Sequence, residues 1–492
     1  MRRLLIILPL LLSLNLQATN YYVKTGGNDG LAGTSDANAW ATLSKVNSIT
    51  FAAGDSIFFR RGDTFRGSLY QTENGTASNW IYYGAYGTGA KPKILGSKDL
   101  SSTSDWTNHS GNVWKTSATL GTLQQDISNL IFNNEASCGY KKRSIDSLNA
   151  QGKFFYNTTD HLVYLYSTSN PGTYYTHIEA AGHHDIYQAV LYFINCSYIK
   201  IENLDVRYSS ADGIEGRDVN GFIIENCDVS YIGGEWFLDA PDLRRVGNGL
   251  QLSVNIDSAY IINCTAHQCY DAGISPQAWV NGSVMSNIWI YNNVVTNCWY
   301  SYETWSAPTY TLSNVHFYHN TCIDAGYCWS NSVHQRPDRN NASHVIIWAL
   351  TGTATNVTVR NNIFVNSTNF VYRLDDNVNK LVVDYNVAVG DTVGYTAEST
   401  KYTTLAAWVA AMSQDAHSID DDPLFVSSTN FNLQSTSPAK DIGVQLGLTT
   451  DFTGTPRGYL PDIGAYEYED IRIATIGGRA VITGGKIMTI RK

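Results

Sequence analysis

A short phrase recurs along the middle of the chain from residue 198 onward. Each copy is a run of alternating β-branched or aromatic residues that ends in an asparagine and continues as a second short run. The aligned asparagines are Asn203, Asn226, Asn263, Asn293, Asn320, Asn362 and Asn386. Their spacing varies from 23 to 42 residues, whereas the blades of a propeller repeat more regularly. A constant strand–asparagine–strand unit with loops of variable length predicts a single right-handed parallel β-helix, and therefore an all-β fold.

The repeated asparagines have a structural interpretation. An asparagine amide both donates and accepts hydrogen bonds, so the same bend in successive coils can carry a ladder of stacked amides. Cys227 and Cys264 follow the asparagine in successive copies. We expect them to stack as core cysteines, with a disulfide as the second possibility. The chain has eight cysteines and no CxxC pair, so a zinc or redox motif is not predicted.

Two flanking segments carry a resemblance to a known superfamily. Residues 21–97 include the phrases "GDSIFFRRGDTF" and "AYGTGAKPKI", and residues 451–468 read "DFTGTPRGYLPDIGAYEY". These segments resemble the opening and closing parts of secreted bacterial β-helix proteins of the pectate-lyase-like superfamily. The resemblance implies the architecture. It leaves the chemistry open, because the superfamily includes lyases, hydrolases, epimerases and phage tailspikes.

The chain divides into five predicted segments. Between the opening coils and the repeats, the sequence reads as hairpins of a β-rich insertion or irregular coils, and the end reads as a short β tail punctuated by Gly-Gly. A short helix is expected near residues 401–413. The segments are a signal peptide (1–18), opening coils (19–97), the insertion (98–180), repeats with the closing segment (181–468) and the tail (469–492).

The first 18 residues have the pattern of a secretory signal peptide. Arg2 and Arg3 precede a short apolar run, and Ala18 supplies a small residue at the expected cleavage point. The apolar run is too short to span a bilayer comfortably, and no later segment is apolar enough. We therefore expect a bacterial protein that is secreted, periplasmic or held at the cell surface.

The charge of the mature chain narrows the class of partner. Without residues 1–18 it has 31 Lys and Arg against 43 Asp and Glu, a formal net charge of −12. Nucleic acid is disfavoured because phosphate neutralisation needs clustered basic residues. The 32 tyrosines and 12 tryptophans suit surfaces that stack on sugars. We expect a polysaccharide partner and a monomer without a membrane span.

A second landmark follows each repeat and places polar residues on one face. The phrases are "ADGIEGR", "GNGLQLS", "DAGISPQ" and "YSYETWS". Successive strand residues face opposite ways, so aligning these phrases predicts two rows. The row predicted to face outwards is Glu215, Gln251, Ser275 and Glu303. The opposite row is Ile214, Leu250, Ile274 and Tyr302, and its first three members are predicted to face the interior.

The preferred catalytic pair is Asp271 and Glu303. They belong to adjacent coils, which lie about 4.8 Å apart. Such carboxylates fall in the range of glycosidase pairs, about 5–5.5 Å for retaining and about 6.5–9.5 Å for inverting enzymes. The alternative is that Glu303 is an ordinary surface acid. Glu215 and Glu235 are substrate-contacting candidates and fallback partners for catalysis.

Further residues are predicted to contact the substrate. Tryptophans of the same coils could stack on sugar rings, or could cover the edge of the sheets. An arginine of "HQRPD" could bind a sugar carboxylate or sulfate, or brace Glu303. The histidine of that phrase has no partner at ligand spacing, so no metal site is predicted. This set consists of Trp236, Gln251, Gln277, Trp279, Trp305, His334 and Arg336.

Three functions fit these patterns. A glycoside hydrolase needs two carboxylates and stacking surfaces, which the central coils supply, and it needs no cofactor. A polysaccharide lyase acting on a uronate polymer needs a Lys or Arg base and positive charge, which calcium could supply. Lysines are scarce in the repeats, which favours the hydrolase. A non-catalytic glycan adhesin, or a tailspike-like binder, is the third possibility.

Overall fold

The computed structural model describes most of the chain between residues 18 and 483. Apart from Ala18, the predicted signal peptide lies outside the described residues. No described helix is both long and apolar enough to cross a membrane. The described ranges are 18–120, 124–184, 189–235, 246–330, 341–348, 352–374, 378–389, 394–397, 400–469, 472–476 and 479–483.

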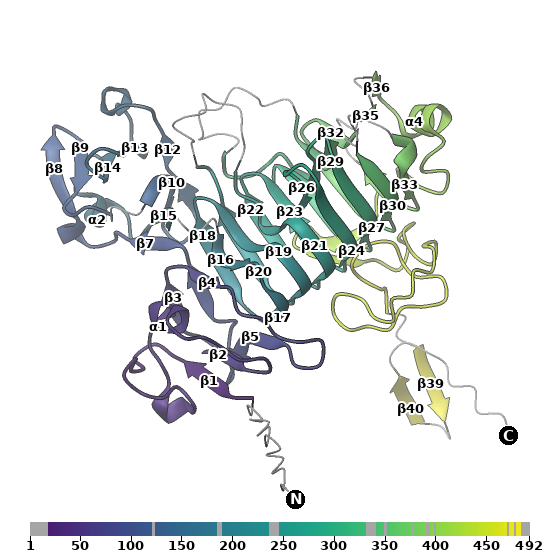
Figure 1. Cartoon of the computed structure of the whole chain (residues 1–492). Helices are drawn as coiled ribbons and strands as arrows, with labels where there is room; N and C mark the ends of the chain where they lie inside the picture. Colours follow the sequence, from purple (N-terminus) through teal and green to yellow (C-terminus); the bar gives the residue numbers. More distant parts are fainter. Residues whose placement is uncertain are drawn as a thin grey trace, which may run out of the picture.

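Most described strands belong to two long sheets in which most neighbours run parallel (Figure 1). The larger, sheet A, has 18 strands and the second, sheet B, has 13. The strands of sheet A are β1 (Asn20–Val23), β2 (Ser56–Arg60), β4 (Leu69–Gln71), β5 (Ile81–Tyr86), β16 (Ala189–Ile194), β17 (Ser197–Glu202), β19 (Asp212–Glu225), β21 (Leu250–Ile262), β23 (Ala272–Gln277), β24 (Ser283–Tyr291), β26 (Tyr300–Trp305), β27 (Tyr310–Tyr318), β29 (Ser343–Trp348), β30 (Thr353–Arg360), β32 (Phe370–Leu374), β33 (Leu381–Asp384), β35 (Tyr395–Ala397) and β36 (Thr400–Tyr402). The strands of sheet B are β3 (Thr64–Arg66), β6 (Lys93–Leu95), β7 (Ser97–Asp99), β10 (Gln124–Phe132), β11 (Ser137–Cys138), β15 (Ile178–His184), β18 (Asp205–Ser209), β20 (Asp228–Ile232), β22 (Thr265–Cys269), β25 (Val294–Thr296), β28 (Thr321–Ala325), β31 (Ile363–Ser367) and β34 (Val387–Val389). The predicted all-β class and the parallel stacking of coils are confirmed.

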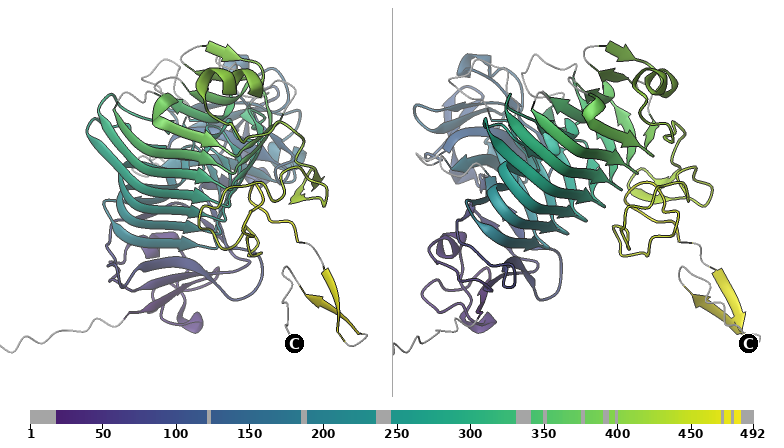
Figure 2. Two further views of the ribbon diagram at one scale, coloured as in Figure 1. Left: turned by 90° about the vertical axis from the view of Figure 1, so that its right-hand side faces the viewer. Right: turned by 45° about the vertical axis from the view of Figure 1, so that its right-hand side comes forward.

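Each central coil passes through sheet A in two halves before it reaches sheet B. Strands β19 and β21 run through both halves and shift register between Arg217 and Val219, where Asp218 has a positive φ. In later coils the halves are separate strands, such as β23 and β24. Figure 2 shows the strands stacked one above another. We call the part of sheet A before this bend the first half and the part after it the second half.

Two adjacent positions at the turn into sheet B stack from coil to coil. One position is buried, and its side chains are Cys227, Cys264, Asn293, Asn320, Asn362 and Asn386. Asn320 shows the ladder: its Nδ2 donates to Asn362 Oδ1 at 3.0 Å and to Ile290 O at 3.1 Å. The preceding position has a positive φ in every coil and is occupied by Asn203, Asn226, Asn263, Asn292, His319, Asn361 and Tyr385.

The sequence alignment of the asparagines was therefore wrong by one residue for three coils. Asn203, Asn226 and Asn263 occupy the left-handed position, and the buried ladder begins at Asn293. Asparagine suits both positions for different reasons, since it tolerates a positive φ and its amide can bridge coils. The predicted stacking of Cys227 with Cys264 is confirmed, with the Cys227 amide 3.4 Å from Cys264 Sγ. All eight cysteines are free thiols.

The insertion leaves the parallel sheets and packs against the first repeats. Its mostly antiparallel sheet consists of β8 (Trp106–Ser110), β9 (Val113–Thr116), β12 (Tyr140–Lys141), β13 (Lys153–Asn157) and β14 (Leu162–Tyr166). Strands β10 and β15 of the same segment extend sheet B (Figure 1). The insertion has its own apolar core, which includes Phe132, Phe154 and Leu165. Its strand β15 pairs with β18 of the repeats, and Ile131 shares an apolar cluster with Tyr208.

Helices are few and short among the described residues. The predicted helix near residues 401–413 is confirmed as α4 (Leu405–Met412), whose Trp408 is buried and donates to Asp415 at 2.9 Å. The others are α1 (Leu43–Asn47), α2 (Pro171–Tyr174) and the 3₁₀ turns η1 (Asp36–Asn38), η2 (Thr103–Asp105), η3 (Ile145–Ser147) and η4 (Val378–Lys380). Two hairpins complete the chain: β37 (Phe425–Ser427) with β38 (Asn430–Leu433), and β39 (Arg472–Ile476) with β40 (Arg479–Thr483).

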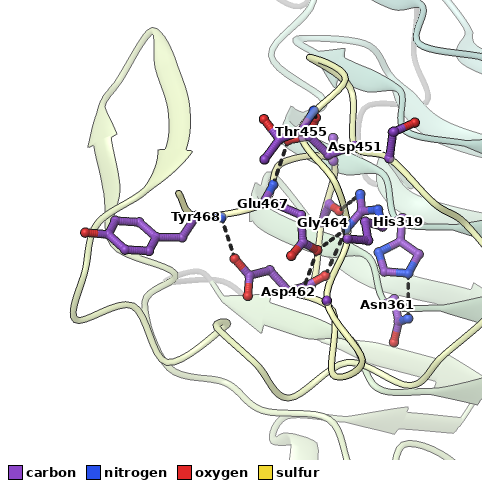
Figure 3. A network of polar contacts seen from close by, with 12 residues as sticks. His319, Asn361, Asp451, Thr455, Asp462, Gly464, Glu467 and Tyr468 are labelled. Atoms are coloured by element: carbon purple, nitrogen blue, oxygen red, sulfur yellow. Dashed lines mark hydrogen bonds and ion pairs between the residues drawn. The ribbon is translucent and has the colours of Figure 1, made fainter. Parts of the chain in front are cut away.

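The closing segment is held against the turns by a buried arginine. Arg457 donates to Glu467 at 2.8 Å, to Asn292 at 2.8 Å and to the Gly464 carbonyl at 3.0 Å. Figure 3 shows Glu467, Asp462 and Gly464 of this segment beside His319 and Asn361 of the coils. The network fixes residues 451–468 beside the second half of sheet A.

The asparagine ladder predicts a large stability effect at one residue. Asn320→Ala removes the acceptor of the Asn293 amide and the donor to Ile290, and it leaves buried polar groups unpaired. We expect the free energy of unfolding to fall by about 3 kcal/mol, measured by urea denaturation. Asn430→Ala in the exposed β37–β38 hairpin is the control and should cost less than about 1 kcal/mol. Equal effects of the two substitutions would contradict the ladder's role.

Candidate functional site

The predicted outward row exists in the first half of sheet A. Glu215 pairs in register with Gln251, and Gln251 pairs with Ser275. Ile274 pairs with Tyr302, which places Ser275 beside Glu303. The opposite row, Ile214, Leu250, Ile274 and Tyr302, lies in the main apolar core. The alternation of the strands therefore turns Glu215 and Glu303 away from that core.

The residues of this row face away from the core but are nevertheless buried. Glu215 is 1% exposed and Glu303 is 7% exposed, so Glu303 is not an ordinary surface acid. Gln277 Nε2 donates to Glu303 Oε2 at 2.9 Å, and Ser275 Oγ donates to the Glu303 carbonyl at 3.2 Å. Gln277 thus holds the orientation of the Glu303 carboxylate.

A group of buried acids gathers where the chain returns from sheet B to the first half of sheet A. Asp212, Glu235 and Asp271 are each at most 6% exposed. The pKa of Asp212 is raised well above its ordinary value, first by burial and then by the nearby charges of Glu215, Asp271 and Glu235. Glu215, Glu235 and Asp271 are thus each close enough to influence Asp212, and we call these four carboxylates the acid cluster.

Asn248 joins the acid cluster to the outward row. The Asn248 amide donates to Asp212 Oδ1 at 2.7 Å, and Asn248 Nδ2 donates to Gln251 Oε1 at 2.6 Å. Asn248 Oδ1 accepts from the Ala272 amide at 3.1 Å. Asn248 therefore links three successive coils through its backbone amide and its side chain, and it fixes the positions of Asp212 and Gln251 relative to each other.

Glu215 has the environment of a carboxyl group that keeps its proton. Burial raises the pKa of Glu215 to about 7, while a hydrogen bond from Ser253 and the charge of Arg217 act in the opposite direction. Ser253 Oγ donates to Glu215 Oε1 at 2.6 Å. The other oxygen, Oε2, is buried and has no hydrogen-bond partner among the described residues. An acid that is half protonated near neutral pH is suited to general acid catalysis.

The insertion adds a buried ion pair to this region. Lys141 and Asp126 lie in direct contact, and both are buried. Burial lowers the pKa of Lys141, while the charges of Asp126 and Glu235 act against that shift. The influence of Glu235 places Lys141 next to the acid cluster.

Two tight loops bring Glu235 and Asn248 together. Gly233 and Gly247 both have a positive φ, and a Cβ built on Gly247 would lie 2.1 Å from the Gly233 Cα. Only glycine fits such a close backbone approach. The phrases "IGGEW" and "VGNGL" therefore bring the two chain segments that carry Glu235 and Asn248 into close contact at Gly233 and Gly247.

The tryptophans and the other residues predicted to contact a sugar differ in where the structure places them. Trp305, at the end of β26, is 41% exposed and leaves a face open to a ligand. Trp279 is half-buried, and the Arg217 guanidinium lies 4.6 Å from its ring centre. Trp236, His334 and Arg336 lie outside the described residues.

The sequence reasoning missed Asp212, Asp126 and Lys141. Asp212 had a signal, since it directly precedes the glycine of the first landmark phrase. Asp126 and Lys141 belong to the insertion, which has no period, so no pattern could bring them to the repeats.

One described cluster has the geometry of a metal site, but an arginine occupies it. Asp99, His177 and Glu179 place ligand atoms within 4.8 Å of one another. Arg66 donates to both oxygens of Glu179 at 2.6 Å, and Ser97 Oγ donates to the same carboxylate at 2.7 Å. This network ties the insertion to the opening coils.

The acid cluster, in contrast, offers carboxylate oxygens, which are the ligands that calcium prefers.

No protein-family model and no curated protein matches this chain. Among solved structures, a complex of XylC with xylose has 13% identity and a TM-score of 0.48, covering 76% of this chain and 66% of that one. A glycoside hydrolase has 9% identity and a TM-score of 0.46 over 77% of this chain and 95% of its own. Pectate lyase Pel9A has 13% identity and a TM-score of 0.46, covering 92% of this chain and 97% of its own. At these values the likeness does not identify an activity or a substrate.

The raised pKa of Glu215 predicts how stability depends on pH. An unfolded glutamate has a pKa of about 4.3, so between about pH 4.3 and 7 the folded state holds a proton that the unfolded state has lost. Stability therefore falls as pH rises through this window, on the order of 3 kcal/mol in total. Glu215→Gln should abolish that part of the pH dependence, measured as Tm from pH 5 to 8. The exposed control Glu469→Gln should keep the wild-type slope, and a wild-type slope in Glu215→Gln would contradict the assignment.

Proposed function

We propose that the protein is a polysaccharide-cleaving glycoside hydrolase, with Glu215 as its general acid. The observation that carries this proposal is the pairing of a proton-holding carboxyl, Glu215, with further buried carboxylates in one cluster. Hydrolysis of a glycosidic bond needs one carboxyl that donates a proton and a second that acts on water or on the sugar, and a cluster of buried carboxylates can supply both. The predicted signal peptide supports export, and we propose that the enzyme acts outside the cytoplasm as a monomer.

Asp271 is the proposed partner of Glu215. Glu215 is in register with Ser275 two coils on, so Asp271 lies two coils away and four residues earlier along its own coil. Both carboxylates are near enough to Asp212 to raise its pKa. Because the two residues are not direct neighbours, we assign them to the wider carboxylate spacing of inverting enzymes. The pair expected from the sequence, Asp271 with Glu303, stays a prediction. Asp271 belongs to both this pair and the pair with Glu215.

The proposed reaction uses both residues in one step. Glu215 donates its proton to the glycosidic oxygen as the bond from that oxygen to the anomeric carbon breaks. Asp271 accepts a proton from a water molecule, which attacks the anomeric carbon from the opposite side. The sugar leaves as a hemiacetal and an alcohol, and solvent restores the two protonation states. Trp305, with its exposed ring, is a candidate to stack on a neighbouring sugar.

Lys141 favours a second candidate function, the polysaccharide lyase. A buried lysine with a lowered pKa can serve as the base that removes a proton beside a uronate carboxylate. The acid cluster would then hold a calcium ion that neutralises the substrate acid. The non-catalytic adhesin is the remaining alternative, and it predicts binding without cleavage.

Substitution of the two glutamates tests the hydrolase proposal. Glu215→Gln keeps size but removes the transferable proton, so we expect kcat to fall by at least about 100-fold. Glu303→Gln, three coil positions along the row, should keep kcat within about tenfold. The measurement is release of reducing ends across plant, algal and bacterial polysaccharides. The reverse order of effects would restore the sequence-based pair, and normal rates in both variants would reject a role for either glutamate in catalysis.

Chelation separates the hydrolase from the lyase. If hydrolysis is correct, EDTA should leave turnover within about twofold, because no step needs a cation, and products should lack unsaturated uronate absorbance. Complete loss that calcium reverses, together with that absorbance, would instead establish the lyase. Lys141→Met is the matched variant. It should remove lyase activity but not hydrolase activity, because only the lyase requires the Lys141 amine to act as a base.

A further inference from the structure

A second surface of sheet A has the features of a ligand site and lies away from the acid cluster. A groove of about 230 Å³ is lined by Trp289, His316, Tyr318 and Arg360, with Leu446 of the closing segment as a wall. The four sheet residues lie on β24, β27 and β30, in the second half of sheet A. The acid cluster lies at the start of the first half, before the bend at Asp218.

Aromatic rings form two adjacent rows on this face. In the first row, Tyr260, Trp289 and His316 follow one another in register, and the Tyr260 and Trp289 rings stack at 4.8 Å. In the second row, the Tyr291 and Tyr318 rings stack at 5.6 Å. Stacked rings spaced by one coil form a flat, half-buried platform of the kind on which successive sugars can lie.

Arg360 supplies a positive charge to this face of the sheet. Arg360 stands next to Tyr318 in the second row, and its Nε is buried without a hydrogen-bond partner among the described residues. The acids of that row make contacts of their own: Glu225 pairs with Lys200 at 2.8 Å, and Asp384, the neighbour of Arg360 in the next coil, lies 2.8 Å from His417 Nδ1.

The neighbouring histidine does not add a competing charge. Burial, and then the charge of Arg360, lower the pKa of His316. Its Nδ1 lies 2.8 Å from Thr358 Oγ1. At neutral pH the positive charge of the groove therefore comes from Arg360, which favours an anionic ligand.

We propose that this groove binds an anionic sugar of a polysaccharide strand. Arg360 contacts its carboxylate or sulfate, and Trp289 stacks on a sugar ring. The inference rests on the proposed function in taking the ligand to be a polysaccharide, and it adds a site separate from the one that cleaves. A second attachment point on the same strand raises the local concentration of polymer at the acid cluster.

The test measures retention in affinity electrophoresis, with Glu215→Gln as the parent so that the gel polymer is not consumed. The gels contain polygalacturonate or its methyl ester, and dextran sulfate or dextran, so each anionic polymer has a neutral counterpart. We expect retention by at least one anionic polymer and none by its neutral counterpart. The polymer that retains the protein distinguishes carboxylate from sulfate.

Variants then assign the retention to the groove. Arg360→Gln removes the charge and leaves a shorter polar side chain, and we expect at least about tenfold weaker binding. Trp289→Ala should also weaken binding, and far-UV circular dichroism checks that both variants fold. The controls Arg60→Ala and Tyr459→Ala, which change exposed residues elsewhere, should bind within about twofold of the parent.

Three results would overturn the proposal: no retention of the parent, equal retention by the neutral polymers, or unchanged binding of Arg360→Gln. Failure of the proposed function would appear separately, as turnover that persists in Glu215→Gln.

Discussion

The turn into sheet B sets the register of every repeat. At this turn one residue has a left-handed backbone and the next is buried, and the buried position carries cysteines in early coils and hydrogen-bonded asparagines from Asn293 onward. A shift of one residue would move Glu215 into the core and Ile214 out of it, because strand side chains alternate. The placement of both proposed sites depends on this constraint.

Burial of the outward-facing row is the feature that makes these residues suited to catalysis. On an open sheet, Glu215 and Glu303 would be solvated acids with ordinary titration behaviour. Here the insertion, the Gly233 and Gly247 loops and Asn248 bring further polar groups to the same place. The second half of sheet A remains accessible by contrast, and its aromatic rows and Arg360 suit recognition rather than proton transfer.

The sequence predicted the features that repeat. Alternation within "ADGIEGR", "GNGLQLS" and "DAGISPQ" was enough to place Glu215, Gln251 and Ser275 in one row, because stacked coils keep their register. The asparagine alignment failed by one residue where two adjacent positions both favour asparagine. Lys141 and Asp126 could not be predicted, since their contact joins an aperiodic insertion to the repeats. The local alternation indicated direction but not burial, so the raised pKa of Glu215 was also out of reach.

The most direct test of the account is a crystal structure of the Glu215→Gln protein with a bound oligosaccharide of the cleaved polymer. The account predicts a glycosidic oxygen within hydrogen-bond distance of the side chain at position 215, and Asp271 facing the anomeric carbon from the other side. An oligosaccharide whose scissile bond lies beside Glu303, with position 215 out of contact, would contradict it.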